Sequence, residues 1–171
     1  MASELHVDAI KHSGGTSAIT INSSGNVSIP GSVVQVARTY SANSGYIQTT
    51  STSLVASGFQ CSLTPKFSNS LILVDFVSSM GDGDADTLKA KMYLKIGSAS
   101  IASMPGAEQY HIGFNGTSFN RYSPNCFSGS YTATSTDTLM FEPYILSNGG
   151  GNVRLAHTQA SVGLTVMEIA Q

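Results

Sequence analysis

Short alternations of apolar and polar residues recur along this chain, and such alternation is typical of half-buried β-strands. In residues 88–96, Leu, Ala, Met, Leu and Ile alternate with Lys and Tyr. This segment predicts an antiparallel strand with one buried face and one wet face. Turn residues separate further expected strands at residues 33–40, 53–59, 60–64, 71–78, 126–134, 138–146, 152–157 and 162–170. No stretch has the period of a long helix, so the sequence predicts an all-β sandwich or jelly roll.

Residues 18–31 (AITINSSGNVSIPG) predict two very short strands around a polar turn. A hairpin of this size is marginal in water, and no partner strand is expected before Val33. We therefore expect the same segment of other copies of the chain to cover it. Pro30 and Gly31 mark the expected boundary between an N-terminal β stalk, residues 1–31, intertwined with its copies in an oligomer, and a sandwich domain, residues 32–171.

Two expected strands, residues 71–77 and 162–170, are apolar on both faces. A strand in a lone antiparallel sandwich needs one buried face, so the second apolar face indicates a subunit interface. Glu168 interrupts the second strand and requires solvent, an axial channel or a polar partner. The candidate interface residues from this pattern and from the N-terminal pair are Ile19, Ile21, Val27, Ile29, Leu164 and Val166.

Charged residues make up 11% of the 171 residues, far below the roughly 25% of a typical soluble domain. The net charge of −2 provides no basic field for nucleic acid or an anionic membrane. The first residues lack the pattern of a signal peptide, and no apolar run is long enough to span a bilayer. We therefore expect folding in a cytoplasm, without membrane insertion, and reduced, packed thiols at Cys61 and Cys126 rather than a bridge.

Asp82, Asp84 and Asp86 place a carboxylate at every second position, as in the start of a Ca²⁺ loop. An EF-hand also needs Gly at its sixth position and Glu at its twelfth, where this chain has Thr87 and Tyr93. The EF-hand is excluded, which leaves a different Ca²⁺ site or a solvated turn. No histidine pair has the spacing of a metal site, and we expect no metal or other cofactor.

Catalytic motifs are missing from the sequence, which has no G-x-S-x-G elbow, P-loop or G-x-G-x-x-G. Its carboxylates are scattered, so nothing pairs two of them for glycan cleavage. We therefore expect no enzyme. The strongest candidate for recognition is a loop rich in aromatic residues, Asn and Gly, whose alternative role is packing against the sandwich or a neighbouring subunit. The receptor-binding candidates in it are Tyr110, His111, Phe114, Asn115, Phe119, Arg121 and Tyr122.

Three stretches of the chain resemble fibre-like virion proteins of tailed bacteriophages of the marine and cyanobacterial type. These stretches are SELHVDAIKHSGGTSAITINSSGNVSIPGSV, TSTSLVASGFQCSLTPKFSNSLILV and the closing LTVMEIA. The resemblance covers both ends and much of the middle, whereas residues 81–130 match poorly. It implies a homotrimer with a jelly roll similar to the C1q/TNF type, located in the virion. The N-terminus would bind other virion proteins, with anchor candidates Glu4, Leu5, Val7 and Ile10.

The resemblance implies a structural tail or head fibre that projects from tail or capsid and contributes to recognition of the host surface. It leaves two kinds of receptor open, a cell-surface glycan or a protein. Two alternatives stay open as well. One is a capsid decoration or cement protein with the same trimer and no receptor, and the other is a soluble C1q-like binding module.

Overall fold

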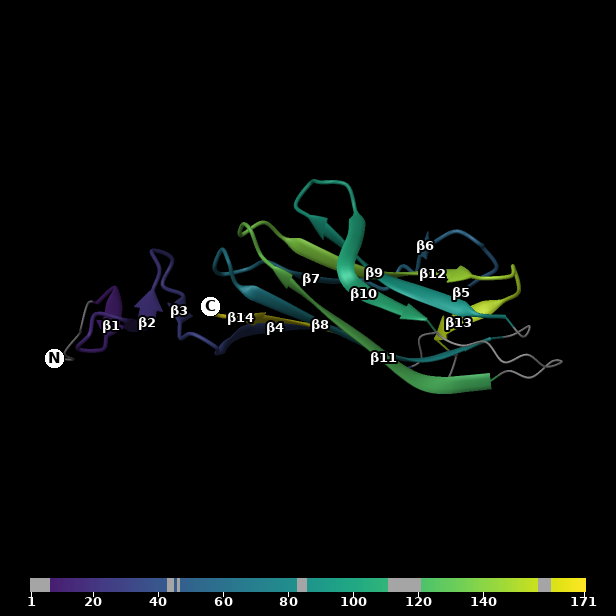
Figure 1. The fold of residues 1–171 in the computed structure, drawn as a ribbon, viewed down its shortest axis with the longest axis horizontal. Coiled ribbons are helices and arrows are strands. Elements are labelled where there is room, and N and C mark those ends of the chain that lie inside the picture. Colours follow the sequence, from purple (N-terminus) through teal and green to yellow (C-terminus); the bar gives the residue numbers. More distant parts are fainter. Residues whose placement is uncertain (1–6, 43–44, 46, 83–85, 111–120, 157–160) are drawn as a thin grey trace.

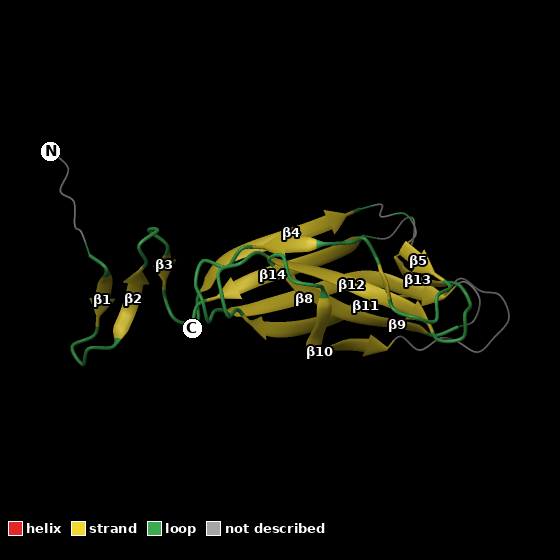
Figure 2. Ribbon diagram, turned by 90° about the horizontal axis from the view of Figure 1, so that it is seen from above, coloured by secondary structure: helices red, strands yellow, loops and turns green. Residues whose placement is uncertain are grey.

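The computed structural model describes residues 7–42, 45, 47–82, 86–110, 121–156 and 161–171, with the backbone alone for residues 80–82, 105–110, 121–123 and 125. Every regular element in this part of the chain is a strand, which confirms the all-β prediction. The strands that pair in the sandwich lie in two layers beside a small N-terminal sheet (Figures 1 and 2).

One layer holds six strands in the order β4-β14-β8-β13-β5, with β11 paired to β8. Its strands are β4 (Val33–Ser41), β5 (Ile47–Thr49), β8 (Leu71–Asp82), β11 (Arg121–Thr132), β13 (Val153–Ala156) and β14 (Val162–Ile169). The other layer holds five strands in the order β10-β9-β12-β6, with β7 paired to β12. Its strands are β6 (Val55–Ala56), β7 (Cys61–Leu63), β9 (Leu88–Ile96), β10 (Ala102–Tyr110) and β12 (Leu139–Ser147).

The strand order is that of a jelly roll. The strands β4, β14, β8 and β11 form one layer, and β7, β12, β9 and β10 form the other, with antiparallel pairing throughout. Among these eight strands the chain changes layer at every step except from β9 to β10, which pair with each other, as in the Greek-key connections of that fold. The predicted sandwich architecture is confirmed by this order.

The core lies between the two layers and follows the alternation seen in the sequence. Leu88, Ala90, Met92 and Leu94 on β9 are buried, whereas the residues between them are half-buried. On β8, Phe76 is fully buried, and its ring lies 5.0 Å from that of Phe127 on β11. The prediction for residues 88–96 is confirmed in both its bounds and its faces.

Two candidate interface residues belong to this core. Leu164 and Val166 on β14 are both 0% exposed in the single chain. They lie opposite Phe76 and Val74 of β8 in the register of the sheet. Neither side chain can contact a second copy, so their assignment to a subunit interface was wrong. A strand with two apolar faces does not reveal from its sequence which face the core takes.

Strands β10 and β11 extend through residues that the sequence favours as turns. Pro105 and Gly106 lie in β10 where its register with β9 shifts between Ser103 and Glu108. Pro124 lies in β11 opposite Ser79. Both strands are at the edge of their sheet, where a residue without an N–H is tolerated.

The N-terminal sheet consists of β1 (Ala9–Lys11), β2 (Ser17–Ile21) and β3 (Val27–Ser28), in that order. The expected pair of short strands is confirmed by β2 and β3. The expectation that no strand of the same chain adjoins them was wrong, because β1 pairs with β2. No side chain among residues 7–32 is buried, so this sheet has no core of its own.

The chain enters the sandwich beside its own last strand. The Gly31 N–H donates to the Ala170 carbonyl over 2.8 Å, and the Ala170 N–H donates to the Ser32 carbonyl over 2.9 Å. Asn22 adds a contact from the N-terminal sheet, since its Nδ2 donates to the Lys66 carbonyl over 3.3 Å. The N-terminal sheet is therefore attached at the end of the sandwich where β14 finishes (Figure 2).

Glu168 has a polar partner rather than solvent or a channel. It is 0% exposed and accepts from the N–H groups of Lys66 at 2.9 Å and Phe67 at 3.0 Å, and from Ser70 Oγ at 2.6 Å. Gln35 Nε2 on β4 donates to its other oxygen over 2.6 Å. One carboxylate thus joins β14, β4 and the connection between β7 and β8.

Candidate functional site

The strands that flank the predicted receptor-binding segment, β10 and β11, belong to different layers, and β11 begins at the end of the sandwich opposite the N-terminal sheet (Figure 1). Strand β10 ends at Tyr110, opposite Lys89, and β11 begins at Arg121, opposite Asp82. The backbone alone is described for Tyr110, Arg121 and Tyr122. The other candidates lie outside the described residues: His111, Phe114, Asn115 and Phe119. Receptor binding by this segment stays a prediction.

At the same end, Asp86 is held by hydrogen-bond donors. Its carboxylate accepts from the N–H groups of Thr87 at 2.6 Å, Gly149 at 2.9 Å and Gly151 at 2.8 Å, and from the Ser147 hydroxyl. Burial acts to raise the pKa of Asp86, but these hydrogen bonds outweigh it and the pKa is lowered. The sequence flagged Asp86 as a candidate Ca²⁺ ligand, but the structure surrounds it with donors and makes it a link between β9, β12 and the turn before β13.

The other two aspartates of that motif add no ligand that can be described. Asp82 is described by its backbone alone, and Asp84 lies outside the described residues. Within the described part of the chain, no three His, Cys, Asp or Glu side chains gather closely enough to hold a metal ion.

The outer face of the five-stranded layer carries the wet residues predicted from residues 88–96. Tyr93 of β9 stacks on Tyr144 of β12, with ring centroids 4.0 Å apart. The pKa of Tyr144 is raised by burial first, and then by the nearby Glu142 and Tyr93. Glu142 is 3% exposed and accepts from the Gly58 N–H at 2.8 Å and from Gln60 Nε2 at 2.9 Å. Sequence periodicity identified Tyr93, but it gave no sign that Tyr144 would lie beside it.

One face of the N-terminal sheet is aliphatic. Ile10 of β1 lies opposite Ile19 of β2, and Ile21 of β2 lies opposite Val27 of β3. Because cross-strand partners and alternate residues share a face, these four side chains lie together. Ile10 is 49% exposed, Val27 is 50% exposed, and Ile29 just beyond β3 is 46% exposed. The structure thus brings the anchor candidate Ile10 onto the same face as three interface candidates.

The remaining anchor candidates lie at or before the first described residue. Val7 is 36% exposed, and Glu4 and Leu5 lie outside the described residues.

The outer face of the six-stranded layer is also largely apolar. Met167 of β14 lies between Val36 of β4 and Leu73 of β8 in the register of the sheet. The exposed fraction is 57% for Val36 and 54% for Val77. The prediction that residues 71–77 present two apolar faces is confirmed. On the same face, the Arg38 guanidinium lies over the Tyr40 ring, 4.9 Å from its centroid.

The two cysteines are free and differ in exposure. Cys61 is buried, which raises the pKa of its thiol, while hydrogen bonds to Thr39 partly offset the rise. Cys126 is exposed and lies opposite Val77 on the outer face of the six-stranded layer. The expectation of a packed thiol is correct for Cys61 and wrong for Cys126.

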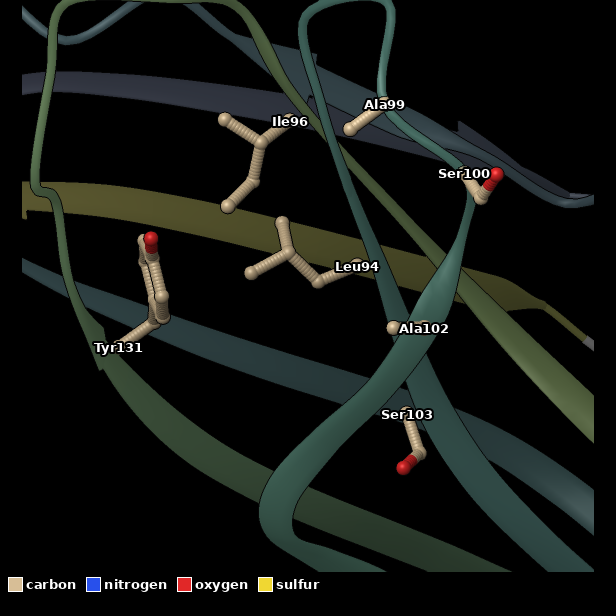
Figure 3. Close-up of a pocket in the computed structure, with 7 residues that line it drawn as sticks. All are labelled: Leu94, Ile96, Ala99, Ser100, Ala102, Ser103 and Tyr131. Atoms are coloured by element: carbon tan, nitrogen blue, oxygen red, sulfur yellow. The ribbon is translucent and has the colours of Figure 1, made fainter.

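Two surface pockets are further candidate binding sites. One of about 220 Å³ lies under the turn that joins β9 to β10. Figure 3 shows Leu94 and Ile96 of β9 between Tyr131 of β11 on one side and Ala102 and Ser103 of β10 on the other. Another of about 310 Å³ lies between the N-terminal sheet and the sandwich.

No described helix could cross a membrane.

Comparison with known proteins gives no family. No protein-family model matches the chain, and no curated protein matches it. Among solved structures, the chain is similar to the Eiger TNF from S. frugiperda, with 9% identity and a TM-score of 0.44 over 80% of this chain and 92% of that one. It is also similar to the CBM22-1 xylan-binding domain from Paenibacillus barcinonensis Xyn10C, with 11% identity and a TM-score of 0.33 over 83% and 97% of the two chains. The assignment of the fold rests on the strand order described above rather than on these likenesses.

Proposed function

We propose that this chain is a fibre-like structural protein of a phage virion, which assembles as a homotrimer, attaches through its N-terminus and presents the far end of the sandwich to the host surface. The observation that supports it best is the N-terminal sheet, which has an aliphatic face and no buried side chain in the single chain. The resemblance of three sequence stretches to phage fibres supports the attachment and the symmetry.

The N-terminal sheet needs a cover. A sheet of three very short strands is marginal without packing against another surface. Ile10, Val27 and Ile29, just beyond β3, are each about half exposed, and Ile19 and Ile21 are partly exposed. The same face of another copy supplies a matching aliphatic surface. Around an axis, such faces would bury one another and form a common core.

The outer face of the six-stranded layer supplies a second contact in this proposal. Val33, Val36, Tyr40 and Val77 are each more than half exposed, and exposed apolar patches on soluble domains mark interaction sites. Val33 opens β4, four residues after Ile29. An assembly that brings the N-terminal sheets together therefore also brings β4 of each copy close to its neighbours.

The direct test is the native mass of the full chain by light scattering. A homotrimer has three times the 17.8 kDa chain mass. Val36→Lys places a charge in the proposed contact and should lower the mass, whereas Thr134→Lys, at an exposed position outside either apolar face, should leave it unchanged. Ile21→Lys places a charge in the aliphatic face of the N-terminal sheet. A monomeric full chain, or a native mass unchanged by both Val36→Lys and Ile21→Lys, would refute the proposed assembly.

Receptor binding and decoration are separated by a different measurement. Replacing Tyr110, Phe114 and Arg121 with Ala should reduce adsorption of particles to host cells if the far end binds a receptor. Unchanged adsorption by particles that carry the variant in normal amount would favour a capsid decoration protein. If the chain does not join particles at all, a soluble binding module is the remaining alternative.

A further inference from the structure

The groove between the N-terminal sheet and the sandwich has fixed walls. Asn22 Oδ1 accepts from the N–H groups of Ser24 at 3.0 Å and Asn26 at 2.9 Å, while its Nδ2 donates to the Lys66 carbonyl. On the opposite wall, Ser70 Oγ lies 2.6 Å from Glu168 Oε1. These residues use their polar groups to hold the two walls in place.

The other polar side chains of the groove are available to a ligand. Thr20, Ser28, Ser68, Asn69 and Gln171 line it, and in the described part of the chain none of these five side chains has a hydrogen bond with the protein. They provide hydroxyl and amide groups, which both donate and accept.

The remaining features of the lining indicate a neutral ligand with many hydroxyl groups. Phe67 lines the groove and is half-buried, so an aromatic ring adjoins the polar groups. All side chains that line the groove are uncharged, so none of them offers an opposite charge to an ionic ligand. The volume of about 310 Å³ is at the small end of the roughly 300–1,000 Å³ of ligand pockets.

We propose that this groove binds a short, neutral saccharide, with the Phe67 ring packing against the apolar face of a sugar and Asn69, Ser68 and Thr20 bonding its hydroxyl groups. The inference deepens the proposed role in surface recognition, because it names a ligand class and a site, but it requires neither the trimer nor the far end of the sandwich. Since both walls contribute, a bound saccharide would also hold the N-terminal sheet against the sandwich.

The test measures binding of a panel of methyl glycosides and neutral disaccharides to the full chain by saturation-transfer NMR, followed by titration of those that bind. Asn69→Gly removes the amide and suits the backbone, because Asn69 has φ of 67°. Phe67→Leu removes the ring and keeps an apolar side chain, and Thr20→Val removes one hydroxyl at an exposed site. Asn148→Gly, at an exposed position outside the groove, is the matched control.

We expect each groove variant to weaken binding by between about twofold and tenfold, the range for one hydrogen bond or one aromatic contact, and the control to bind as the unaltered chain does. Absence of binding by every neutral saccharide would overturn the proposal. So would binding that all three groove variants leave unchanged, or that Asn148→Gly weakens equally. The native mass of each variant is measured alongside, so a failure of assembly is recognised separately from a failure of the groove.

Discussion

The carboxylate of Glu168 offers the sharpest test of how this fold is held together. It is fully buried and receives hydrogen bonds from Lys66 N, Phe67 N, Ser70 Oγ and Gln35 Nε2. Glu168→Gln keeps the shape of the side chain but replaces one acceptor oxygen with an NH₂ group. Whichever way the amide is turned, that group faces at least one donor of the protein, so one hydrogen bond is lost and the others lose their charge assistance.

The size of the effect follows from the count of donors. Hydrogen bonds to a charged group contribute about 1.5–3 kcal/mol and neutral ones about 0.5–1.5 kcal/mol. Losing one bond and weakening the rest lowers the free energy of unfolding by about 2–4 kcal/mol. With a urea m-value of about 2 kcal/mol/M, the unfolding midpoint falls by about 1–2 M.

The measurement is urea unfolding followed by circular dichroism at one fixed chain concentration, because self-association changes apparent stability. Glu142→Gln is the matched control, since Glu142 is also buried but accepts from two donors, one on each oxygen. One of those bonds is lost and only one other loses its charge assistance, so the loss is about 1.5–3 kcal/mol, which is smaller than at Glu168. A Glu168→Gln midpoint within about 0.2 M of the unaltered chain, or a larger shift for Glu142→Gln, would refute the reasoning.

Three further predictions follow from the site and the core. The pKa of Asp86 is lowered in the folded chain, so its stabilising effect is present above its ordinary pKa of 3.8 and is lost as the pH falls below that value. Asp86→Asn should therefore reduce the fall of the urea midpoint at acidic pH. An unchanged fall of the midpoint would contradict this prediction. Leu164→Ala should lower the free energy of unfolding by about 2–5 kcal/mol in urea titrations, and a cost below about 1 kcal/mol would mean that this side chain is not in the core. A thiol reagent should spare buried Cys61 and should modify Cys126 only when the proposed assembly dissociates, because Cys126 lies beside Val77 on the outer face. Mass spectrometry of the labelled peptides checks this, and rapid modification of Cys126 in the assembled protein would contradict a subunit contact at that face.

The parts of the fold that the sequence predicted are those with a local signal. Residues 88–96 alternate strictly, and the buried and wet faces of β9 follow that alternation. The turn at Asn22 to Gly25 also has a local cause, because the Asn22 side chain accepts from Ser24 and Asn26. Where residues close in sequence determine the structure, the pattern is sufficient.

The parts that the sequence did not predict depend on distant residues. Glu168 was recognised as needing a partner, yet its donors lie about a hundred residues earlier, with Ser70 separated by 98 positions. The choice of the core face of β14 depends on β8 and β4 on either side of it. Strand β10 was missed because Pro105 and Gly106 favour a turn, and its place at a sheet edge removes that objection.

The groove could not be predicted from the sequence, because its residues are distant from one another along the chain. Thr20 and Ser28 come from the N-terminal sheet, and Phe67 and Asn69 come from a connection of the sandwich. No motif links these positions along the chain, and hydrogen bonds of Asn22 to Lys66 and of Gly31 and Ser32 to Ala170 bring the two parts together. The aromatic segment between β10 and β11 drew attention instead, since its residues are adjacent in sequence.

The way the chain enters the sandwich determines how a pulling force would act on it. From Ser32 onward β4 runs antiparallel to β14, and the pairing extends from Val33 opposite Ile169 to Ser41 opposite Val162. Hydrogen bonds of such a ladder are perpendicular to the strands, so tension applied through the N-terminal sheet along β4 loads them in shear. The bonds must then yield together rather than one after another, which makes this junction mechanically strong under tension along β4.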